Sequence, residues 1–359
     1  MRHMLNTLYV MTQDSYLAKE GENLLLRVDK EVRFRIPVHN LEAVVCFGHV
    51  NVSPPLMRLC MDSNVAISFL TEHGAFQGRV VGAAHGNVLL RRRHYRMADD
   101  PATAGRLASR FVIGKLANSR HVLDRAIHDH AAQTARINEI RSALAEHVRT
   151  ARDAAEVDHV RGIEGDASRL YFSVFDNLIL QNKDGFFFRE RSRRPPLDAM
   201  NSLLSFLYTL LMHDVRAALE TVGLDSAVGF LHQDRPGRPS LALDMMEELR
   251  PMLADRLALT LVNRRQVEPA GFVAKESGGI IMDDQTRKKV LTAWQTHKQE
   301  EIRHPFLDEK IRLGLVPYAQ SLLLARHVRG DIDDYPPFIW SRQPAGVGGQ
   351  PAGKTESQP

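Results

Sequence analysis

The sequence predicts an α+β protein in which a small N-terminal β-sheet domain is followed by a larger all-α C-terminal domain. Short apolar and β-branched runs separated by turn residues recur over the first eighty-odd residues. From Arg106 onward the chain shows helical periodicity, and its next proline is Pro195. With 359 residues, 44% of them hydrophobic and 25% charged, the chain is long enough for two domains with sizeable cores.

The N-terminal domain is predicted over residues 1–90. Residues such as Gly21 and Gly48 punctuate six runs that we interpret as strands, at 5–10, 24–28, 32–37, 41–47, 65–70 and 76–81. Strands this short bury an apolar face only by packing against another layer, so we expect a two-layer sheet domain.

The C-terminal domain is predicted over residues 91–340. Apolar residues follow one another at steps of three and four, as at Ile137, Ile140, Leu144 and Val148. A second stripe with strict steps of four starts at Leu249 and is interrupted by Pro251, which predicts that one helix ends at Arg250 and another begins at the proline. The tail, 341–359, is rich in Pro, Gly, Gln and Ser and is predicted to be disordered.

Composition says more about the cellular compartment of the protein than about its function. A formal net charge of +4 with a pI near 9.1 is a mild basic bias that does not by itself demand nucleic acid. The two cysteines, Cys46 and Cys60, form no C-x-x-C pair, which argues against a zinc site and favours a reducing compartment. The most apolar stretch, 203–212, is about half the length of a membrane span. The sequence therefore predicts a cytoplasmic protein with no membrane partner.

Two segments of the helical half carry candidate metal ligands. Glu164 lies in the run RGIEGDASRLYF, next to a glycine that would allow close approach of the backbone. The alternative is that Glu164 and Asp166 supply the acidic start of a helix. His232 follows an apolar pair and precedes a loop rich in Pro, Gly and Arg, and the alternative is a structural histidine.

A third segment, SLALDMMEELRP, supplies further acids. Ser240 is a candidate N-cap for a helix on which Asp244 and Glu247, three residues apart, share one face. Glu248 fits four-residue spacing equally well and could take the place of Glu247. A solvated acidic face is the alternative interpretation.

Together these groups form a mixed nitrogen and oxygen donor set that suits Mn²⁺ and can accept Mg²⁺. A divalent cation there would lower the pKa of a bound hydroxyl and stabilise charge on a phosphodiester oxygen. The surroundings favour an anionic substrate, because guanidinium groups bind phosphate oxygens well. Candidate arginines are Arg189, Arg191, Arg193, Arg194, Arg235 and Arg238, whereas the run 91–96 is better interpreted as a solvated surface.

These motifs, in this order, resemble the CRISPR-associated adaptation integrase/endonuclease family, whose members capture foreign DNA as new spacers. The resemblance runs to about residue 340 and is strongest at EGDASR from Glu164, RRPPLDAMNSLLS from Arg193, GFLH ending at His232 and SLALDMME ending at Glu247. The stretch PYAQSLLLARHVRG, 317–330, with PPFIW, 336–340, resembles the subtype I-C branch.

The resemblance implies that Glu164, His232 and Glu247 are the catalytic metal ligands, with Asp244 as a supporting acid. It implies Mg²⁺ or Mn²⁺ as cofactor, DNA as substrate, a homodimer and a small partner subunit of the same adaptation module. In the implied reaction a spacer 3′-OH attacks a phosphodiester at the repeat boundary. Two alternatives remain: a stand-alone structure-selective DNA repair nuclease, and a non-catalytic DNA-binding scaffold.

Overall fold

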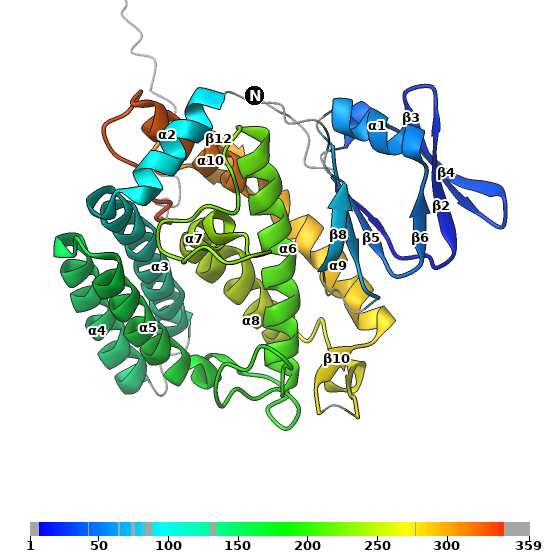
Figure 1. Cartoon of the computed structure of the whole chain (residues 1–359). Helices are drawn as coiled ribbons and strands as arrows, with labels where there is room; N and C mark the ends of the chain where they lie inside the picture. The colour runs from blue at the N-terminus through cyan, green and yellow to red at the C-terminus, as the bar shows by residue number, and fades with distance from the viewer. Residues whose placement is uncertain are drawn as a thin grey trace, which may run out of the picture.

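The computed structural model describes residues 7–41, 43–63, 65–72, 76–80, 82, 88–129, 134–276 and 278–340. The strands that come first in the chain gather on one side of the molecule, and the helices that follow gather on the other (Figure 1). The long helix α6, Ala199–Thr221, runs beside the strands, and its Phe206 ring lies 6.3 Å from that of Phe47. The two halves therefore meet along α6.

The N-terminal half contains two four-stranded sheets. In the first, β1 pairs with β5 and β5 with β7 in parallel, and β8 joins β7 antiparallel; in the second the order is β4-β3-β2-β6. A core that includes Leu17, Leu24, Leu56 and Ile67 fills the space between them and helix α1. The strand bounds are β1 Thr7–Val10, β2 Ser15–Glu20, β3 Asn23–Val28, β4 Glu31–Pro37, β5 Ala43–Phe47, β6 Val50–Val52, β7 Ala66–Leu70 and β8 Phe76–Val80. Each of the six predicted strands overlaps an observed one.

Three elements of this half were missed by the sequence prediction: β2, β6 and the helix α1, Pro54–Asp62. β2 has mixed polarity and β6 is only three residues long, so neither gives a clear periodic signal. The start of α1 was signalled, because Ser53 caps Leu56 through its hydroxyl and prolines follow at the first helical positions.

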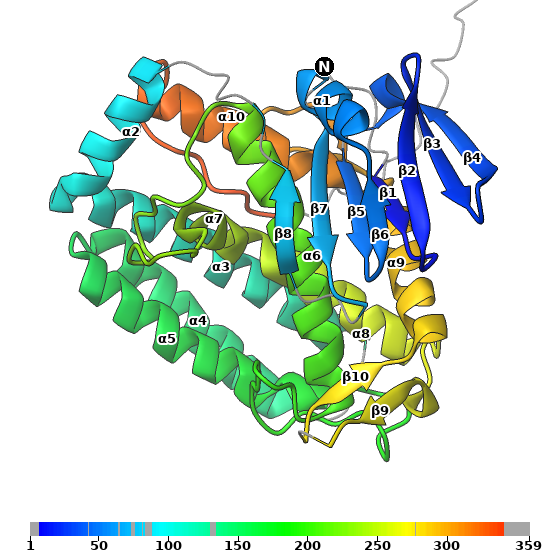
Figure 2. The same cartoon turned by 45° about the vertical axis from the view of Figure 1, so that its right-hand side comes forward.

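The C-terminal half is mainly helical and buries one large core. Helices α3, α4 and α5 form a layer that lies against α7, and α10 and α2 cover another edge (Figure 2). The bounds are α2 Val88–Asp99, α3 Pro101–Asp129, α4 Thr134–Asp153, α5 Val157–Ser173, α6 as above, α7 Ser240–Leu249, α8 Arg256–Asn263, α9 Asp284–Lys298 and α10 Val316–Arg329.

The prediction that this half is all α needs a correction, because it also holds two small antiparallel pairs. β9 Phe272–Ala274 pairs with β10 Ile280–Met282, and β11 Glu301–Arg303 pairs with β12 Lys310–Arg312. Three-residue strands are too short to show a recognisable alternation of apolar and polar residues in the sequence.

Two local predictions around α7 are wrong. The chain does not break at Pro251: a π-helical turn, Arg250–Asp255, links α7 to α8. Proline has no N–H with which to donate the usual helical hydrogen bond, and the wider π turn accommodates that missing bond. Ser240 is not the N-cap, since Pro239 holds that position and Ser240 is the first helical residue. The Ser240 hydroxyl instead donates to the carbonyl of Gln233 at 3.1 Å, tying the preceding loop to the helix.

Helix α2 begins at Val88, and β8, the last strand of the N-terminal half, ends at Val80. The tail 341–359, predicted to be disordered, lies outside the described residues. Within the described parts of the chain, no helix is both long enough and apolar enough to cross a membrane.

Candidate metal centre

The three predicted ligands come from three separate elements of the helical half. Glu164 lies inside α5, well beyond its first turn, so the reading that it starts a helix is wrong. His232 lies on the loop between α6 and α7, and Glu247 lies in α7. The Glu247 side chain is only 2% exposed, whereas those of Glu164 and His232 are each 22% exposed. The Glu247 carboxylate is therefore buried, and the Glu164 carboxylate and the His232 imidazole are partly accessible to solvent.

Glu247 is the most strongly held of the three. Its Oε1 accepts a hydrogen bond from Arg250 Nη1 at 2.5 Å, and its Oε2 lies 2.7 Å from Nζ of Lys115 on α3. Burial would raise the pKa of this carboxyl, but the nearby charges of Arg250, Lys115 and His232 outweigh it and lower the pKa to about 2. The ionised form, the form that ligates a cation, is therefore the stable one.

The same ammonium joins Glu247 to Glu164. Lys115 Nζ forms an ion pair with Glu164 Oε1, and that oxygen also accepts a hydrogen bond from the Ser168 hydroxyl at 2.8 Å. His232 Nε2 lies 3.9 Å from Glu247 Oε1. The two carboxylates thus share the Lys115 ammonium, and the imidazole lies near the other oxygen of Glu247.

The Asp244 side chain holds His232 and the backbone just before it. Its fully buried carboxylate accepts the backbone N–H groups of Phe230, Leu231 and His232 at 2.6, 2.9 and 2.9 Å. It also lies 2.6 Å from His232 Nδ1, so that nitrogen carries the proton and Nε2 is left as the acceptor. Gly229 makes this closure possible, since a Cβ there would lie 2.9 Å from the Asp244 carboxylate.

Glu248 belongs to a different network. Its Oε1 accepts from the Tyr335 hydroxyl at 2.5 Å and from Gln320 at 2.9 Å, and its Oε2 accepts from the Phe338 N–H at 3.0 Å. Burial raises its pKa to about 7 against these hydrogen bonds. Of the two adjacent acids, the structure turns Glu247 to the candidate centre and Glu248 to the C-terminal segment.

The donor set fits a hard divalent cation. Two carboxylates and one imidazole nitrogen, with the imidazole fixed from behind by a carboxylate, are ligands that Mn²⁺ and Mg²⁺ accept. Among the described residues, however, no three His, Cys, Asp or Glu side chains are already spaced to enclose an ion. The spacing present is set by the Lys115 ammonium, which lies between the two carboxylates.

The predicted DNA-contacting arginines differ in exposure. Arg193, Arg194 and Arg235 are exposed and Arg238 is half-buried. Arg191, in contrast, turns inward and donates to Asn201 Oδ1 at 2.7 Å, and burial lowers its pKa. Arg191 is therefore part of the fold rather than of a phosphate-binding surface.

The sequence prediction missed two residues of this centre, Lys115 and Arg250. Arg250 lies three residues after Glu247, a spacing that places both on one helix face. Lys115 interrupts the apolar run FVIGKL, and a lysine there signals a buried charge that needs a partner. The sequence therefore indicated a charged residue at each position, but it did not indicate which side chain each one contacts.

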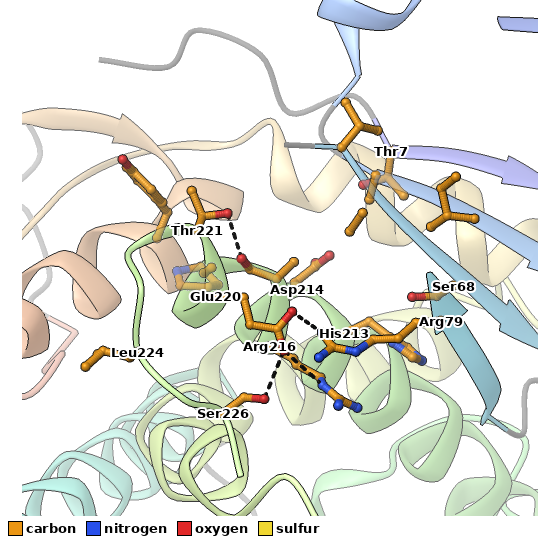
Figure 3. Close-up of a pocket in the computed structure, with 18 of the residues that line it drawn as sticks. Thr7, Ser68, Arg79, His213, Asp214, Arg216, Glu220, Thr221, Leu224 and Ser226 are labelled. Carbon is orange, nitrogen blue, oxygen red and sulfur yellow. Dashed lines mark hydrogen bonds and ion pairs between the residues drawn. The ribbon is translucent and has the colours of Figure 1, made fainter. Parts of the chain in front are cut away.

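A cavity of about 510 Å³ lies elsewhere, between the first sheet and α6 (Figure 3). In it, Glu220 of α6 forms an ion pair with Arg79 of β8 and accepts from Arg216 and Ser226 at 3.3 and 3.0 Å. The described residues that line this cavity do not include Glu164, His232 or Glu247. The ion pair between Arg79 and Glu220 joins the two halves across this cavity, so it is a junction between them rather than the candidate centre.

Comparison with known proteins gives one consistent family. The family model described as CRISPR associated protein Cas1 matches residues 8–296. A protein of Chlorobaculum tepidum named CRISPR-associated endonuclease Cas1 1 is 52% identical over 342 residues, covering 95% of this chain and all of its own length.

Two solved structures share the fold. One is titled as a casposase bound to integration product, with a TM-score of 0.81, 19% identity and coverage of 94% of this chain and 95% of its own. The other is titled as a Cas6-RT-Cas1–Cas2 complex, with a TM-score of 0.80, 22% identity and coverage of 96% of this chain and 37% of its own. At these identities the likeness is one of fold alone.

Proposed function

This chain belongs to the CRISPR associated protein Cas1 family, and on that premise we propose that it is a divalent-metal-dependent DNA endonuclease and integrase of CRISPR adaptation. The observation that carries the proposal is that Glu164 of α5 and Glu247 of α7 share the Lys115 ammonium, while His232 Nε2 lies 3.9 Å from the other carboxylate oxygen of Glu247. A cluster of this kind suits phosphodiester chemistry, in which negative charge must be stabilised on oxygen.

In the proposed centre Glu164, Glu247 and the Nε2 atom of His232 would hold Mg²⁺ or Mn²⁺. The ion would supply Lewis acidity for phosphodiester chemistry. Asp244 keeps the proton of His232 on Nδ1, and Arg250 holds Glu247 in place. These contacts preorganise the ligands before substrate arrives.

The proposed reaction is a transesterification. The 3′-OH oxygen of captured DNA forms a bond to phosphorus at the repeat boundary, and the bond from that phosphorus to the repeat's own 3′ oxygen breaks. Water in place of the 3′-OH gives hydrolysis at the same site. The exposed guanidinium groups of Arg193, Arg194 and Arg235, with Arg238, would bind phosphates and position the strands.

For partners we propose DNA, a second copy of this chain, and a small partner subunit of the adaptation module. The structural neighbour that bears both Cas1 and Cas2 in its title supports the partner subunit, and the casposase bound to integration product supports the strand-joining chemistry.

The test is an integration assay with the chain, the partner subunit, a donor duplex and a repeat target, in Mn²⁺ or Mg²⁺ and in chelator. Metal-dependent strand joining is the expected result. Cleavage without joining, independent of the partner and of repeat sequence, would instead identify a stand-alone repair nuclease. DNA binding without either reaction would identify a non-catalytic scaffold.

A further inference from the structure

We propose that Lys115 is an internal counter-ion of the metal centre, whose ammonium holds Glu164 and Glu247 together until a divalent cation displaces it. The inference rests on the proposed function, because it concerns how the two carboxylates of that site are held before a metal ion binds. It assigns a positioning role to a residue that is not itself a ligand.

The contacts of Lys115 support this role. Its side chain is 10% exposed, its Nζ lies 2.7 Å from Glu247 Oε2, and the same Nζ forms an ion pair with Glu164 Oε1. An ammonium removed from water in this way is costly unless it is paired, and here it is paired twice. A cation that used Glu164 Oε1 and Glu247 Oε2 would therefore compete with this ammonium for the same two oxygens.

The local sequence places the lysine there. Gly114 lets α3 approach α7 closely, since a Cβ at that position would lie 2.7 Å from Glu248 Cβ. The neighbours Ile113 and Leu116 are buried in the core, so α3 cannot rotate Lys115 away without exposing them. The helix is thus fixed in register, and only the flexible lysine side chain is free to move.

Charge balance decides whether lysine and metal can coexist. In the structure the positive charges of Lys115 and Arg250 oppose the negative charges of Glu164 and Glu247. The buried carboxylate of Asp244, in contact with the imidazole of the centre, adds a third negative charge. A divalent cation bound with the ammonium still in place would therefore leave one excess positive charge in a largely buried cluster. Like charges at such separations repel strongly where water is scarce. We therefore expect cation binding to displace the ammonium from these ion pairs.

The experiment compares Lys115→Met with the matched control Lys298→Met. Lys298 is also buried and also forms an ion pair, with Asp214 at 2.8 Å, but it joins α9 to α6 away from the centre. For each full-length variant and for the wild type, Mn²⁺ affinity is measured by calorimetry at one pH. The midpoint of thermal unfolding is measured in chelator and in saturating Mn²⁺.

We expect Lys115→Met to bind Mn²⁺ at least tenfold more tightly than the wild type, because no ammonium has to be displaced. Its midpoint in chelator should fall, because two carboxylates lose their shared counter-ion, and Mn²⁺ should raise that midpoint more than it does for the wild type. Lys298→Met should lose stability in chelator and keep wild-type Mn²⁺ affinity. Should Lys115→Met not fold without metal, the double variant Lys115→Met/Glu164→Gln, which removes one charge of each sign, should regain folding in chelator.

The outcomes separate the two proposals. Wild-type Mn²⁺ binding with equal or weaker binding by Lys115→Met would overturn the counter-ion role alone. Absence of Mn²⁺ binding in both proteins would overturn the proposed metal site and this inference with it. Binding by Lys115→Met but not by the wild type would show that the cation does not displace the ammonium in the native chain, and would overturn the inference.

Discussion

Replacing Asp244 by asparagine tests how the candidate centre is preorganised. Four donors point at this carboxylate: the N–H groups of Phe230 and Leu231 on Oδ2, and the N–H and Nδ1 of His232 on Oδ1. An asparagine keeps one acceptor oxygen and presents an NH₂ group on the other side, so two of the four donors lose their acceptor. Each hydrogen bond to a charged group contributes about 1.5–3 kcal/mol, so the variant should lose about 3–6 kcal/mol of stability.

The variant should also bind metal less well. Without the Asp244 carboxylate, His232 loses the contact that fixes its tautomer and ring orientation. Loss of such a supporting contact weakens metal affinity about 10- to 100-fold. Urea denaturation in chelator measures the first effect, and Mn²⁺ calorimetry measures the second.

The matched control is Asp234→Asn on the same loop. The exposed Asp234 accepts one weak backbone hydrogen bond, from Gly229 at 3.2 Å, so its replacement should cost less than about 0.5 kcal/mol. If Asp244→Asn matched this control in both stability and Mn²⁺ affinity, the assignment of Asp244 as the residue that orients His232 would be refuted.

Three further predictions concern other side chains. Glu247→Gln should abolish Mn²⁺ binding and strand joining, whereas Glu248→Gln should keep both. Glu248→Gln should instead lose about 1–3 kcal/mol of stability in urea denaturation, because it disturbs the donors that anchor the C-terminal segment. The reverse pattern would show that Glu248, and not Glu247, is the metal ligand. Burial, with two nearby arginines, lowers the pKa of His213 to about 4, so its neutral ring contributes stability that is complete above pH 6.5 and is lost as the pH falls toward 4. Through this group the free energy of unfolding at pH 5 should be about 2 kcal/mol below that at pH 7. Urea denaturation of His213→Gln at the two pH values should lack this difference. Replacing the exposed Arg193 and Arg194 by alanine should weaken DNA binding across sequences and lower the slope of log affinity against log salt by about one per lost phosphate contact; an unchanged slope would contradict a role in phosphate binding.

Predictions that depend on periodicity alone were mostly right. The six predicted strands, the long helical half and the shared helix face of Asp244 and Glu247 follow from which residues recur every two or every three to four positions. The elements that were missed or misjudged are those where this signal is short or locally contradicted: three-residue strands, and the π-helical turn that carries Pro251 without ending the helix.

The sequence alone determined the fold class and, through ordered motifs, nominated Glu164, His232 and Glu247. Helical spacing alone left Glu247 and Glu248 open, and only the family resemblance chose Glu247. Neighbouring residues on a helix point about 100° apart, and packing determines which side meets which neighbour. The tertiary structure turned Glu248 to Tyr335 and Glu247 to Lys115. Lys115 and Glu164 are 49 positions apart, on helices α3 and α5. Their ion pair depends on how those helices pack, and helix packing joins residues that no local pattern relates. The sequence thus determined which groups could take part in the chemistry, and the packing of α3, α5 and α7 decided which of them meet.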